Sequence, residues 1–357
     1  MSVYIHIPFC STLCSYCDFP KVYSSLCKKD VYLDALKREI QNKYAGEKVQ
    51  TIYIGGGTPS VLNLEELKTL LEITNLFQKD IREFTIECNV ESITEEKLIL
   101  MQSYGVNRLS IGVETFQEHL LPILNRNHTK EEAIQKIKLA KKYFKNINID
   151  LMYAIPNQTL KDTKKDLNIF FSLKLKHLSY YSLIIEQHTK LYNEKIEYID
   201  SDLDYKMYSY ICKRLKSYHH YEISNFSKKG YESMHNLTYW NNLEYYGFGM
   251  GASGYINGIR YENTKNLHAY LKGITNVDEH QLSKKEKEQE EIFLGLRKLE
   301  GINVKKFEEK YHEKIEDVFQ IADLKKNGYL KQQGNNLYIP KKFIYISNEV
   351  LVRFVGD

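Results

Sequence analysis

Apolar and polar positions alternate in two distinct patterns over the first 225 residues. Short, nearly continuous apolar runs are typical of buried strands, whereas apolar side chains that recur every three or four positions are typical of amphipathic helices. The short runs predict strands at 3–7, 51–54, 84–88, 107–112, 147–152 and 177–184. The helical pattern lies between them, at 29–44, 63–78, 94–104, 129–144, 160–173 and 203–217.

Repeated strand–helix units predict parallel strands that are joined by right-handed crossovers. We therefore expect an α/β fold, with a partial or full (β/α) barrel of the TIM type over residues 1–225. In such barrels the chemistry lies at the carboxyl ends of the strands. A cysteine loop follows the first expected strand, a run of glycines from Gly55 follows the second, and Glu87 ends the third. This agreement supports the barrel.

The pattern changes beyond about residue 226. A stretch rich in glycine and aromatic residues, 245–255, precedes a charged helix near 283–299. A compact tail with an expected hairpin around Asn335 follows. We predict that 226–282 is a connecting region and that 283–357 is a small C-terminal domain of α/β or winged-helix-like type.

Composition and charge exclude several classes of protein. A hydrophobic fraction of 43% is enough for a core, and no apolar run approaches the roughly 18 residues that cross a bilayer. The first residues do not combine a basic segment with an apolar one, so we expect no secretory signal and a cytoplasmic location. A net charge of +4 gives no argument for a nucleic-acid partner.

Three of the six cysteines lie close together in the sequence. In a reducing compartment we expect cysteines to act as ligands or free thiols rather than as a disulfide framework. The motif C-x3-C-x2-C places Cys10, Cys14 and Cys17 on one loop directly after the expected strand 3–7. The remaining cysteines are scattered and are expected to be ordinary thiols: Cys27, Cys88 and Cys212.

The clustered thiolates suit either an iron–sulfur cluster or zinc. Three protein ligands would leave one iron of a [4Fe–4S] cluster open. Structural zinc usually takes four protein ligands, and no fourth cysteine or well-spaced histidine is near. We expect a cluster. A zinc site completed by His6, or a redox disulfide, remains as an alternative.

The sequence resembles the radical S-adenosylmethionine superfamily, in particular the branch that contains oxygen-independent coproporphyrinogen III dehydrogenase and the haem chaperones related to it. The matching stretches follow one another over most of the chain. They are Tyr4-Ile5-His6-Ile7-Pro8-Phe9-Cys10, Cys14-Ser15-Tyr16-Cys17-Asp18-Phe19, Gly55-Gly56-Gly57-Thr58-Pro59-Ser60, Gly105-Val106-Asn107-Arg108-Leu109-Ser110-Ile111-Gly112, Asp150-Leu151-Met152-Tyr153, Tyr221-Glu222-Ile223-Ser224-Asn225-Phe226 and His235-Asn236-Leu237-Thr238-Tyr239-Trp240.

The resemblance implies roles for particular residues. The three clustered cysteines would hold a [4Fe–4S] cluster whose open iron chelates S-adenosylmethionine. Around that cofactor the resemblance places Tyr4 and Tyr16 at its border, Gly56, Gly57 and Thr58 at its amine, Glu87 and Asp150 at its ribose or amine, and Arg126 at its carboxylate. The two carboxylates could instead simply pair within the mouth of the barrel, and a glycine-rich turn alone is often only a turn.

One position departs from the family pattern. The residue before Arg126 in the motif order is usually Gln and is Glu114 here. A carboxylate cannot donate a hydrogen bond as an amide does, so this change affects the expected affinity or orientation of the cofactor. The stretch that begins at Glu186 also fits the family, without an assigned role.

The implied chemistry is reductive. A low-potential cluster can pass one electron to the bound sulfonium. That electron breaks a carbon–sulfur bond and yields methionine and a 5′-deoxyadenosyl radical. A one-electron donor such as flavodoxin or ferredoxin is the implied partner.

Two features favour the haem chaperones over the dehydrogenase. The dehydrogenase has a further cysteine where this chain has Phe19, and it has a longer segment before the cysteine loop. The chain also carries the motif H-N-x-x-Y-W, in which we expect His235 to contact haem while Tyr239 and Trp240 support it. A buried structural histidine within an aromatic cluster is the alternative.

The leading hypothesis is a haem chaperone that delivers haem to a respiratory acceptor, with transient association at a membrane surface. The alternative is an oxygen-independent coproporphyrinogen III oxidase that makes protoporphyrinogen IX. A third interpretation, an electron-transfer module that does not cleave its cofactor, explains neither the glycine-rich turn nor Arg126.

Overall fold

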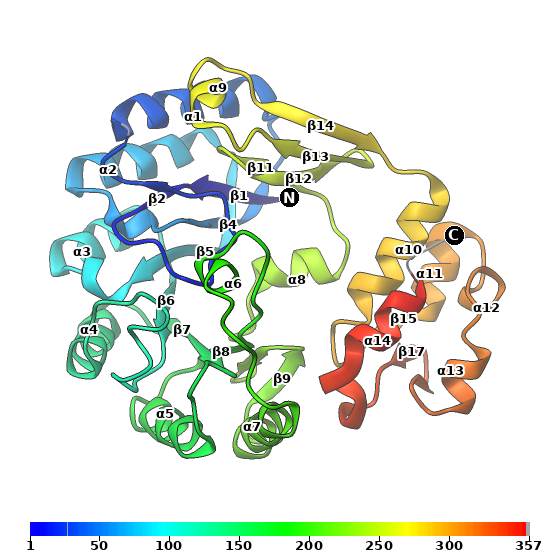
Figure 1. Cartoon of the computed structure of the whole chain (residues 1–357). Helices are drawn as coiled ribbons and strands as arrows, with labels where there is room; N and C mark the ends of the chain where they lie inside the picture. Colours follow the sequence, from blue (N-terminus) through cyan, green and yellow to red (C-terminus); the bar gives the residue numbers. More distant parts are fainter. Residues whose placement is uncertain (27, 355–357) are drawn as a thin grey trace.

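One large sheet organises most of the chain. The computed structural model describes residues 1–26 and 28–354, and Cys27 lies outside them. Twelve strands form the sheet in the order β14-β13-β12-β11-β1-β4-β5-β6-β7-β8-β10-β9. Figure 1 shows the sheet curving around an interior, with helices α1 to α5 and α7 on its outer face.

The six expected strands form the centre of this sheet and run parallel to one another. They are β1 (Ser2–Ile7), β4 (Val49–Gly56), β5 (Lys79–Asn89), β6 (Arg108–Glu114), β7 (Asn146–Tyr153) and β8 (His177–Ser182). The six expected helices are also present: α1 (Lys29–Lys43), α2 (Leu64–Ile73), α3 (Glu95–Ser103), α4 (Lys130–Tyr143), α5 (Leu160–Ser172) and α7 (Ser201–Arg214). The predicted α/β fold with a partial barrel is confirmed.

Local sequence explains where the outer helices begin. The side chains of Asn63, Thr129 and Thr159 each accept a hydrogen bond from a backbone N–H in the first turn of α2, α4 and α5. The carboxylate three residues later accepts a hydrogen bond from the backbone N–H of the capping residue, which completes a capping box. The inner faces of these helices and the central strands bury one continuous apolar core.

The region expected to be a connection, 226–282, extends the sheet. The strand β11 (Tyr245–Phe248) pairs in parallel with β1, and three antiparallel strands follow: β12 (Ser253–Ile256), β13 (Ile259–Asn263) and β14 (Asn276–Gln281). On the other side β10 (Asn225–Ser227) and β9 (His219–Glu222) complete the order. Because β14 and β9 remain edges within the described chain, the barrel is partial rather than closed.

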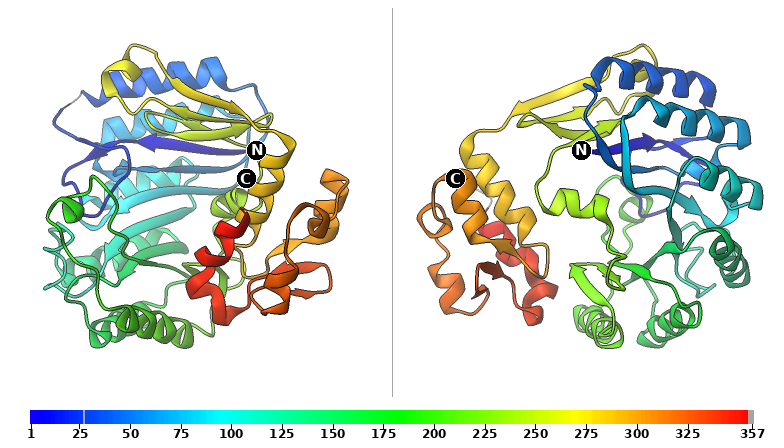
Figure 2. Two further views of the ribbon diagram at one scale, coloured as in Figure 1. Left: turned by 45° about the vertical axis from the view of Figure 1, so that its right-hand side comes forward. Right: turned by 180° about the vertical axis from the view of Figure 1, so that it is seen from behind.

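Residues beyond Leu282 build a second, smaller core around Phe307 and Leu337. Its elements include α10 (Lys284–Gly295), β15 (Ile302–Asn303), α11 (Val304–Tyr311), β16 (Lys331–Gln333), β17 (Asn336–Tyr338) and α14 (Ser347–Leu351). The strands β16 and β17 pair as an antiparallel hairpin, as predicted. Figures 1 and 2 show the helix α8 (Met234–Trp240) between this segment and the sheet, and α8 contacts α10.

The described residues contain no helix with both the length and the apolar character that crossing a bilayer requires. The five cysteines among them are all free, as expected for ligands and ordinary thiols.

Candidate functional site

The cysteine loop lies between the short parallel strands β2 (Phe9–Cys10) and β3 (Val22–Tyr23). Backbone hydrogen bonds of Ser15 join the loop to two distant segments. The N–H of Ser15 donates to the carbonyl of Leu124 at 3.1 Å, and the carbonyl of Ser15 accepts from the N–H of Leu191 at 3.0 Å. The Asn125 side chain also donates to the backbone of the loop. The loop is therefore held from two sides.

The thiols of the loop lie in a partly buried, polar surrounding. Burial raises the pKa of the Cys10 thiol to about 11, although Thr58 opposes this by donating to its sulfur at 3.9 Å. The Arg126 guanidinium donates to the Cys14 sulfur at 3.6 Å. Burial also raises the pKa of the Cys17 thiol. A thiolate at these positions needs a cation beside it, which a metal centre supplies.

This donor set fits an iron–sulfur cluster better than a single ion. In the described part of the chain no three Cys, His, Asp or Glu side chains are grouped as ligands of one metal ion. Each thiolate of a cubic cluster binds a different iron, so such grouping is not required. The imidazole of His6 is already engaged, by the Tyr4 hydroxyl at 2.9 Å and the Pro20 carbonyl at 2.7 Å. These contacts do not favour a zinc site completed by His6.

The glycine-rich turn brings β4 against the start of the cysteine loop. Gly56 has φ +111°, and a Cβ on Gly57 would lie 2.6 Å from the backbone of Pro8. The N–H of Gly57 donates to the Ile7 carbonyl at 2.8 Å. Glycine is therefore needed for the close approach of two backbones. Contact of Gly56, Gly57 and Thr58 with a cofactor stays a prediction.

Glu87 lies near the carboxyl end of β5, beside this turn. Its carboxylate accepts from the Tyr53 hydroxyl at 2.7 Å and from the N–H of Gly56 at 3.0 Å. Burial nevertheless raises the pKa of Glu87 to about 7. The carboxyl group can thus take up or release a proton near neutral pH, and it faces the interior space described below.

Arg126 connects the cysteine loop to the ends of β5 and β6. Besides the Cys14 sulfur, its guanidinium contacts the Asn89 side chain at 3.1 Å, the Gly112 carbonyl at 2.8 Å and the Glu114 carboxylate at 3.8 Å. It is 7% exposed, and the surrounding acidic groups raise its pKa. A planar cation held in this way suits a carboxylate ligand.

Glu114 lies at the end of β6 with φ 65°, in the left-handed region. Burial raises the pKa of its carboxyl to about 7, although Arg126 and the Tyr16 hydroxyl oppose the shift. Because a protonated carboxyl can donate a hydrogen bond, Glu114 can present both a donor and an acceptor near neutral pH. This property reduces the difference from the glutamine that the resemblance implies at this position.

Asp150 lies in β7, further inside the barrel. Its carboxylate accepts from the Ser110 hydroxyl at 2.9 Å and from the Asn148 amide at 2.9 Å. Burial raises its pKa, and hydrogen bonds from Ser179, Ser110 and Asn148 oppose that shift. Protein groups therefore already use part of the hydrogen-bonding capacity of the Asp150 carboxylate. Its contact with a ligand stays a prediction.

An inner cavity of about 540 Å³ opens at the carboxyl ends of β1 and β4. Among the residues that line it are Tyr4, Glu87, His235, Tyr239 and Tyr245. Tyr4 and Glu87, which are predicted to meet S-adenosylmethionine, thus share one space with His235, Asn236 and Tyr239 of the H-N-x-x-Y-W motif.

The motif lies on α8, which is fixed by a buried carboxylate. Glu83 accepts hydrogen bonds from the Ser233 hydroxyl at 3.2 Å and from the N–H groups of Met234 at 2.9 Å and His235 at 3.0 Å. A carboxylate at this position satisfies free N–H groups and complements the helix dipole. The buried Arg108 interacts electrostatically with this carboxylate.

His235 is 1% exposed and uses both ring nitrogens. Nδ1 is 2.8 Å from the Thr51 hydroxyl and Nε2 is 2.7 Å from the Tyr239 hydroxyl. The Tyr53 ring packs against the imidazole with centroids 5.1 Å apart. Burial lowers the pKa of His235 to about 3, so the imidazole is neutral.

Trp240 lies elsewhere. It lines an outer cavity of about 450 Å³ between α8, β11 and α10, which Tyr239 and Tyr245 also line. The Arg297 guanidinium packs over the Trp240 ring at 4.7 Å. His235 and Trp240 therefore do not share a cavity, whereas Tyr239 borders both.

Four residues of this site were not predicted from the sequence: Thr51, Tyr53, Glu83 and Arg108. They share one signal, since each is a polar residue that points into the barrel from a central strand whose neighbouring residues are apolar. Such residues must find partners in the interior.

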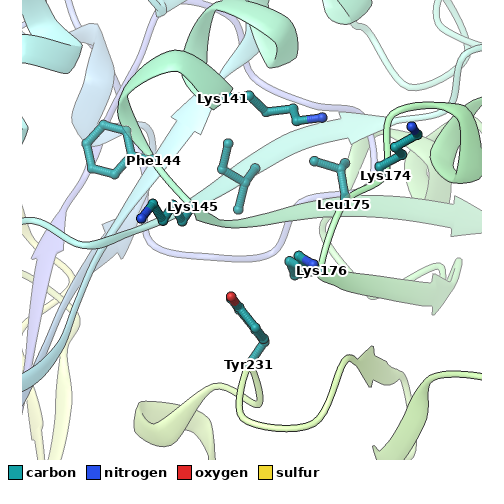
Figure 3. Close-up of a pocket in the computed structure, with 8 residues that line it drawn as sticks. Lys141, Phe144, Lys145, Lys174, Leu175, Lys176 and Tyr231 are labelled. Atoms are coloured by element: carbon teal, nitrogen blue, oxygen red, sulfur yellow. The ribbon is translucent and has the colours of Figure 1, made fainter.

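A separate hollow of about 270 Å³ lies at the amino ends of β7 and β8, away from the cysteine loop. Figure 3 shows its lysine side chains around a short apolar floor, with Tyr231 opposite. None of the predicted site residues lines it. Its lysines are Lys141, Lys145, Lys174 and Lys176.

Comparison with known proteins agrees with this geometry. Residues 4–169 match the family model of the Radical SAM superfamily, and residues 282–342 match that of the HemN C-terminal domain. The structure of coproporphyrinogen III oxidase (HemN) from Escherichia coli superposes with a TM-score of 0.88 over 99% of this chain and 89% of that chain, at 23% identity. That likeness establishes the fold. Fold and cysteine loop together define a radical SAM protein.

Relatives in sequence identify the family within this class of protein. The heme chaperone HemW of Lactococcus lactis is 42% identical and that of Bacillus subtilis 39% identical, with 100% of this chain covered in both cases and 97% and 99% of the relatives. HemW of E. coli is 36% identical over 75% of this chain and 74% of its own length. The chain belongs to the HemW family.

Membership in the superfamily implies a [4Fe–4S] cluster and S-adenosylmethionine as cofactors. The residues present fit them: three thiols on one fixed loop, hydrogen bonds from Thr58 and Arg126 to two of the sulfurs, and a cavity beside the loop. Donors to the sulfurs are among the groups that set a cluster's reduction potential.

Proposed function

We propose that the chain is a haem chaperone: it binds haem beside α8 and passes it to a respiratory acceptor protein. The observation that carries the proposal is the position of the H-N-x-x-Y-W motif. It places Tyr239 on the wall between an inner cavity next to the cysteine loop and an outer cavity that is mostly aromatic and aliphatic. Such walls suit a flat apolar macrocycle.

A second set of residues serves the cluster and S-adenosylmethionine. Cys10, Cys14 and Cys17 hold the cluster, which supplies one-electron reduction of S-adenosylmethionine when both are bound. Thr58 and Arg126 position the thiols of Cys10 and Cys14 through their hydrogen bonds to the two sulfurs. Tyr4, Glu87 and Asp150 are proposed to position the nucleoside.

Three further parts of the proposal concern the surroundings of the protein. A flavodoxin or ferredoxin supplies the electron, and the protein acts in the cytoplasm. The lysine hollow of Figure 3 supports transient contact with an anionic membrane surface, because each lysine near such a surface contributes about 1 kcal/mol. Binding to vesicles that contain an acidic lipid, and not to neutral vesicles, is the expected result.

The proposal is tested with anaerobically reconstituted protein. Haem is added and the Soret absorption is followed; then an apo-form of a respiratory haem protein is added and the appearance of its own spectrum is measured. We expect a shifted Soret band and transfer faster than from free haem. Vinyl formation from coproporphyrinogen III in the same preparation would instead indicate the oxidase.

A further inference from the structure

We propose that Tyr53 is a positioning residue for S-adenosylmethionine, and that its hydroxyl holds the Glu87 carboxylate as an ionised acceptor for donors of the nucleoside. The inference rests on the proposed function, in which Glu87 meets the nucleoside. It is carried by the hydrogen bond between the two side chains, by the space that a glycine leaves beside the carboxylate, and by the cavity that both side chains line.

Three positions of β4 form a seat for the Glu87 carboxylate. The Tyr53 hydroxyl donates to Oε1 at 2.7 Å, and the N–H of Gly56 donates to Oε2 at 3.0 Å. A Cβ on Gly55, between these two donors in the sequence, would lie 2.8 Å from the carboxyl carbon of Glu87. Each oxygen thus receives one donor, and glycine at position 55 leaves the room that the carboxylate occupies.

The seat leaves acceptor capacity for a ligand. An ionised carboxylate has about four lone-pair sites, and the two bonds from β4 use about half of them. Both Tyr53 and Glu87 line the inner cavity of about 540 Å³. A nucleoside offers O–H and N–H donors, which a carboxylate accepts more strongly than a neutral carboxyl does. The protonation state of Glu87 therefore affects binding.

The ionisation of Glu87 depends on groups from several elements. Burial raises its pKa to about 7, and the hydrogen bond from Tyr53 is the largest effect that lowers it. Asp150 on β7 also raises the pKa, whereas the N–H of Gly56 and the Arg108 side chain on β6 lower it. The carboxylate is therefore lost as pH falls through 7, and without the Tyr53 hydroxyl it is lost at a higher pH.

Other titratable groups near this carboxyl and its cavity are neutral around pH 7. Burial raises the pKa of the phenols and the thiol and lowers that of the imidazoles: Tyr4 and His6 on β1, Tyr53 on β4, Cys88 on β5, and His235 and Tyr239 on α8. The cavity is also lined by Asp18 and by the ion pair of Glu262 with Lys265 at 2.8 Å. Because Glu114 beside Arg126 also titrates near pH 7, the test compares variants of Glu87.

Tyr53→Phe removes the hydroxyl and keeps the ring, which packs against His235 with centroids 5.1 Å apart. We expect its affinity for S-adenosylmethionine to be about 3- to 10-fold below that of the wild type near pH 7.5. The two affinities should converge near pH 6, where Glu87 is protonated in both proteins. Since the ionisation of the ligand is common to both, the ratio of affinities reports the protein group.

The experiment is equilibrium binding of S-adenosylmethionine to the anaerobically reconstituted full chain, at a series of pH values from about 6 to 9. Wild type, Tyr53→Phe, Glu87→Gln and the double variant form a cycle. In the Glu87→Gln background, Tyr53→Phe should add no effect that varies with pH. The matched control is Tyr104→Phe, which removes an exposed hydroxyl that donates to Glu72 at 3.2 Å and should leave the wild-type profile.

Gly55→Ala tests the seat by its shape. Gly55 does not have a left-handed backbone conformation, and the added methyl group meets the end of the Glu87 side chain. We therefore expect this variant to displace the carboxylate and to weaken S-adenosylmethionine binding wherever Glu87 is ionised. In a Glu87→Ala background, where the carboxylate is gone, Gly55→Ala should cause no further loss.

A ratio of wild-type to Tyr53→Phe affinity that stays constant with pH, or a pH-dependent effect that persists in the Glu87→Gln background, overturns the inference while the nucleoside site stands. No binding of S-adenosylmethionine to the wild type overturns both the inference and the proposed nucleoside site, whereas haem binding is measured separately. Circular dichroism and the iron and sulfide content show whether each variant is folded and loaded.

Discussion

The guanidinium of Arg126 lies 3.6 Å from the sulfur of Cys14, although 112 positions separate the two residues in sequence. The contact joins the end of the barrel strands to the cysteine loop. One side chain therefore meets both a predicted cluster ligand and the expected position of the cofactor's carboxylate.

Arg126→Gln is expected to weaken S-adenosylmethionine binding. Loss of a hydrogen bond that involves a charged group costs about 1.5–3 kcal/mol, or roughly 10- to 150-fold in affinity. The loss of a cation beside the sulfur also lowers the cluster's reduction potential. Equilibrium binding and potentiometric titration measure the two effects. An unchanged affinity in a variant with full iron and sulfide content would show that Arg126 does not meet the cofactor; the exposed Arg214→Gln is the control.

Glu114→Gln is expected to make folding stability less dependent on pH. Burial raises the folded-state pKa of Glu114 to about 7, from about 4.3 in an unfolded chain. The stability that its proton contributes is complete below the unfolded pKa and is lost as pH rises through 7. Between pH 5 and pH 8, the free energy of unfolding of the variant should therefore increase by about 2–3 kcal/mol relative to that of the wild type.

Urea denaturation at the two pH values measures this difference in the free energy of unfolding. The control is Glu309→Gln, which changes an exposed carboxylate on α11. An equal difference between Glu114→Gln and the wild type at pH 5 and pH 8 would show that Glu114 ionises normally.

Glu83→Gln tests the anchoring of α8. An amide in place of this carboxylate turns a donor toward N–H groups that Glu83 now satisfies, and it removes a charge beside Arg108. We expect a loss of about 1–3 kcal/mol in stability and weaker haem binding. Thermal unfolding and a haem titration measure these losses. Glu309→Gln, which changes the exposed carboxylate on α11, should have little effect; equal losses in the two variants would refute a specific role of Glu83.

Much of the fold could be predicted because its strands and helices have strong, regular apolar patterns. The parallel strands β1, β4, β5, β6, β7 and β8 and the helices that follow them were predicted from such patterns. The pairing of β11 with β1 could not be predicted, since it joins segments more than 200 residues apart. The strand β14 is mostly exposed, so it lacks the apolar run that marks a buried strand.

In the candidate site, too, some residues could be predicted from the sequence and others could not. The thiol loop and Arg126 belong to motifs whose spacing carries chemical information. The place of Trp240 could have been found from helix geometry: residues four apart, such as His235 and Tyr239, share a face, and the next residue is turned by about 100°. The role of Glu83 in holding α8 could not be predicted, because the sequence shows only a charged residue in an otherwise apolar strand.

A substitution in the smaller core around Phe307 tests whether residues 283–357 form a separate domain. Phe307 is 1% exposed and packs among residues beyond 290. Phe307→Ala should cost about 3–5 kcal/mol within a domain at 283–357. Hydrogen exchange should then show loss of protection there while β4 and β5 stay protected. A uniform loss over the whole chain would mean that the segment and the sheet unfold as one unit.

The most direct test of the account is a haem titration of the anaerobically reconstituted chain with and without saturating S-adenosylmethionine. Because the two ligands are assigned to cavities that Tyr239 and Tyr245 separate, the account predicts stoichiometric haem binding with the same affinity in both cases. Mutual exclusion of haem and S-adenosylmethionine, or no haem binding at all, would contradict it.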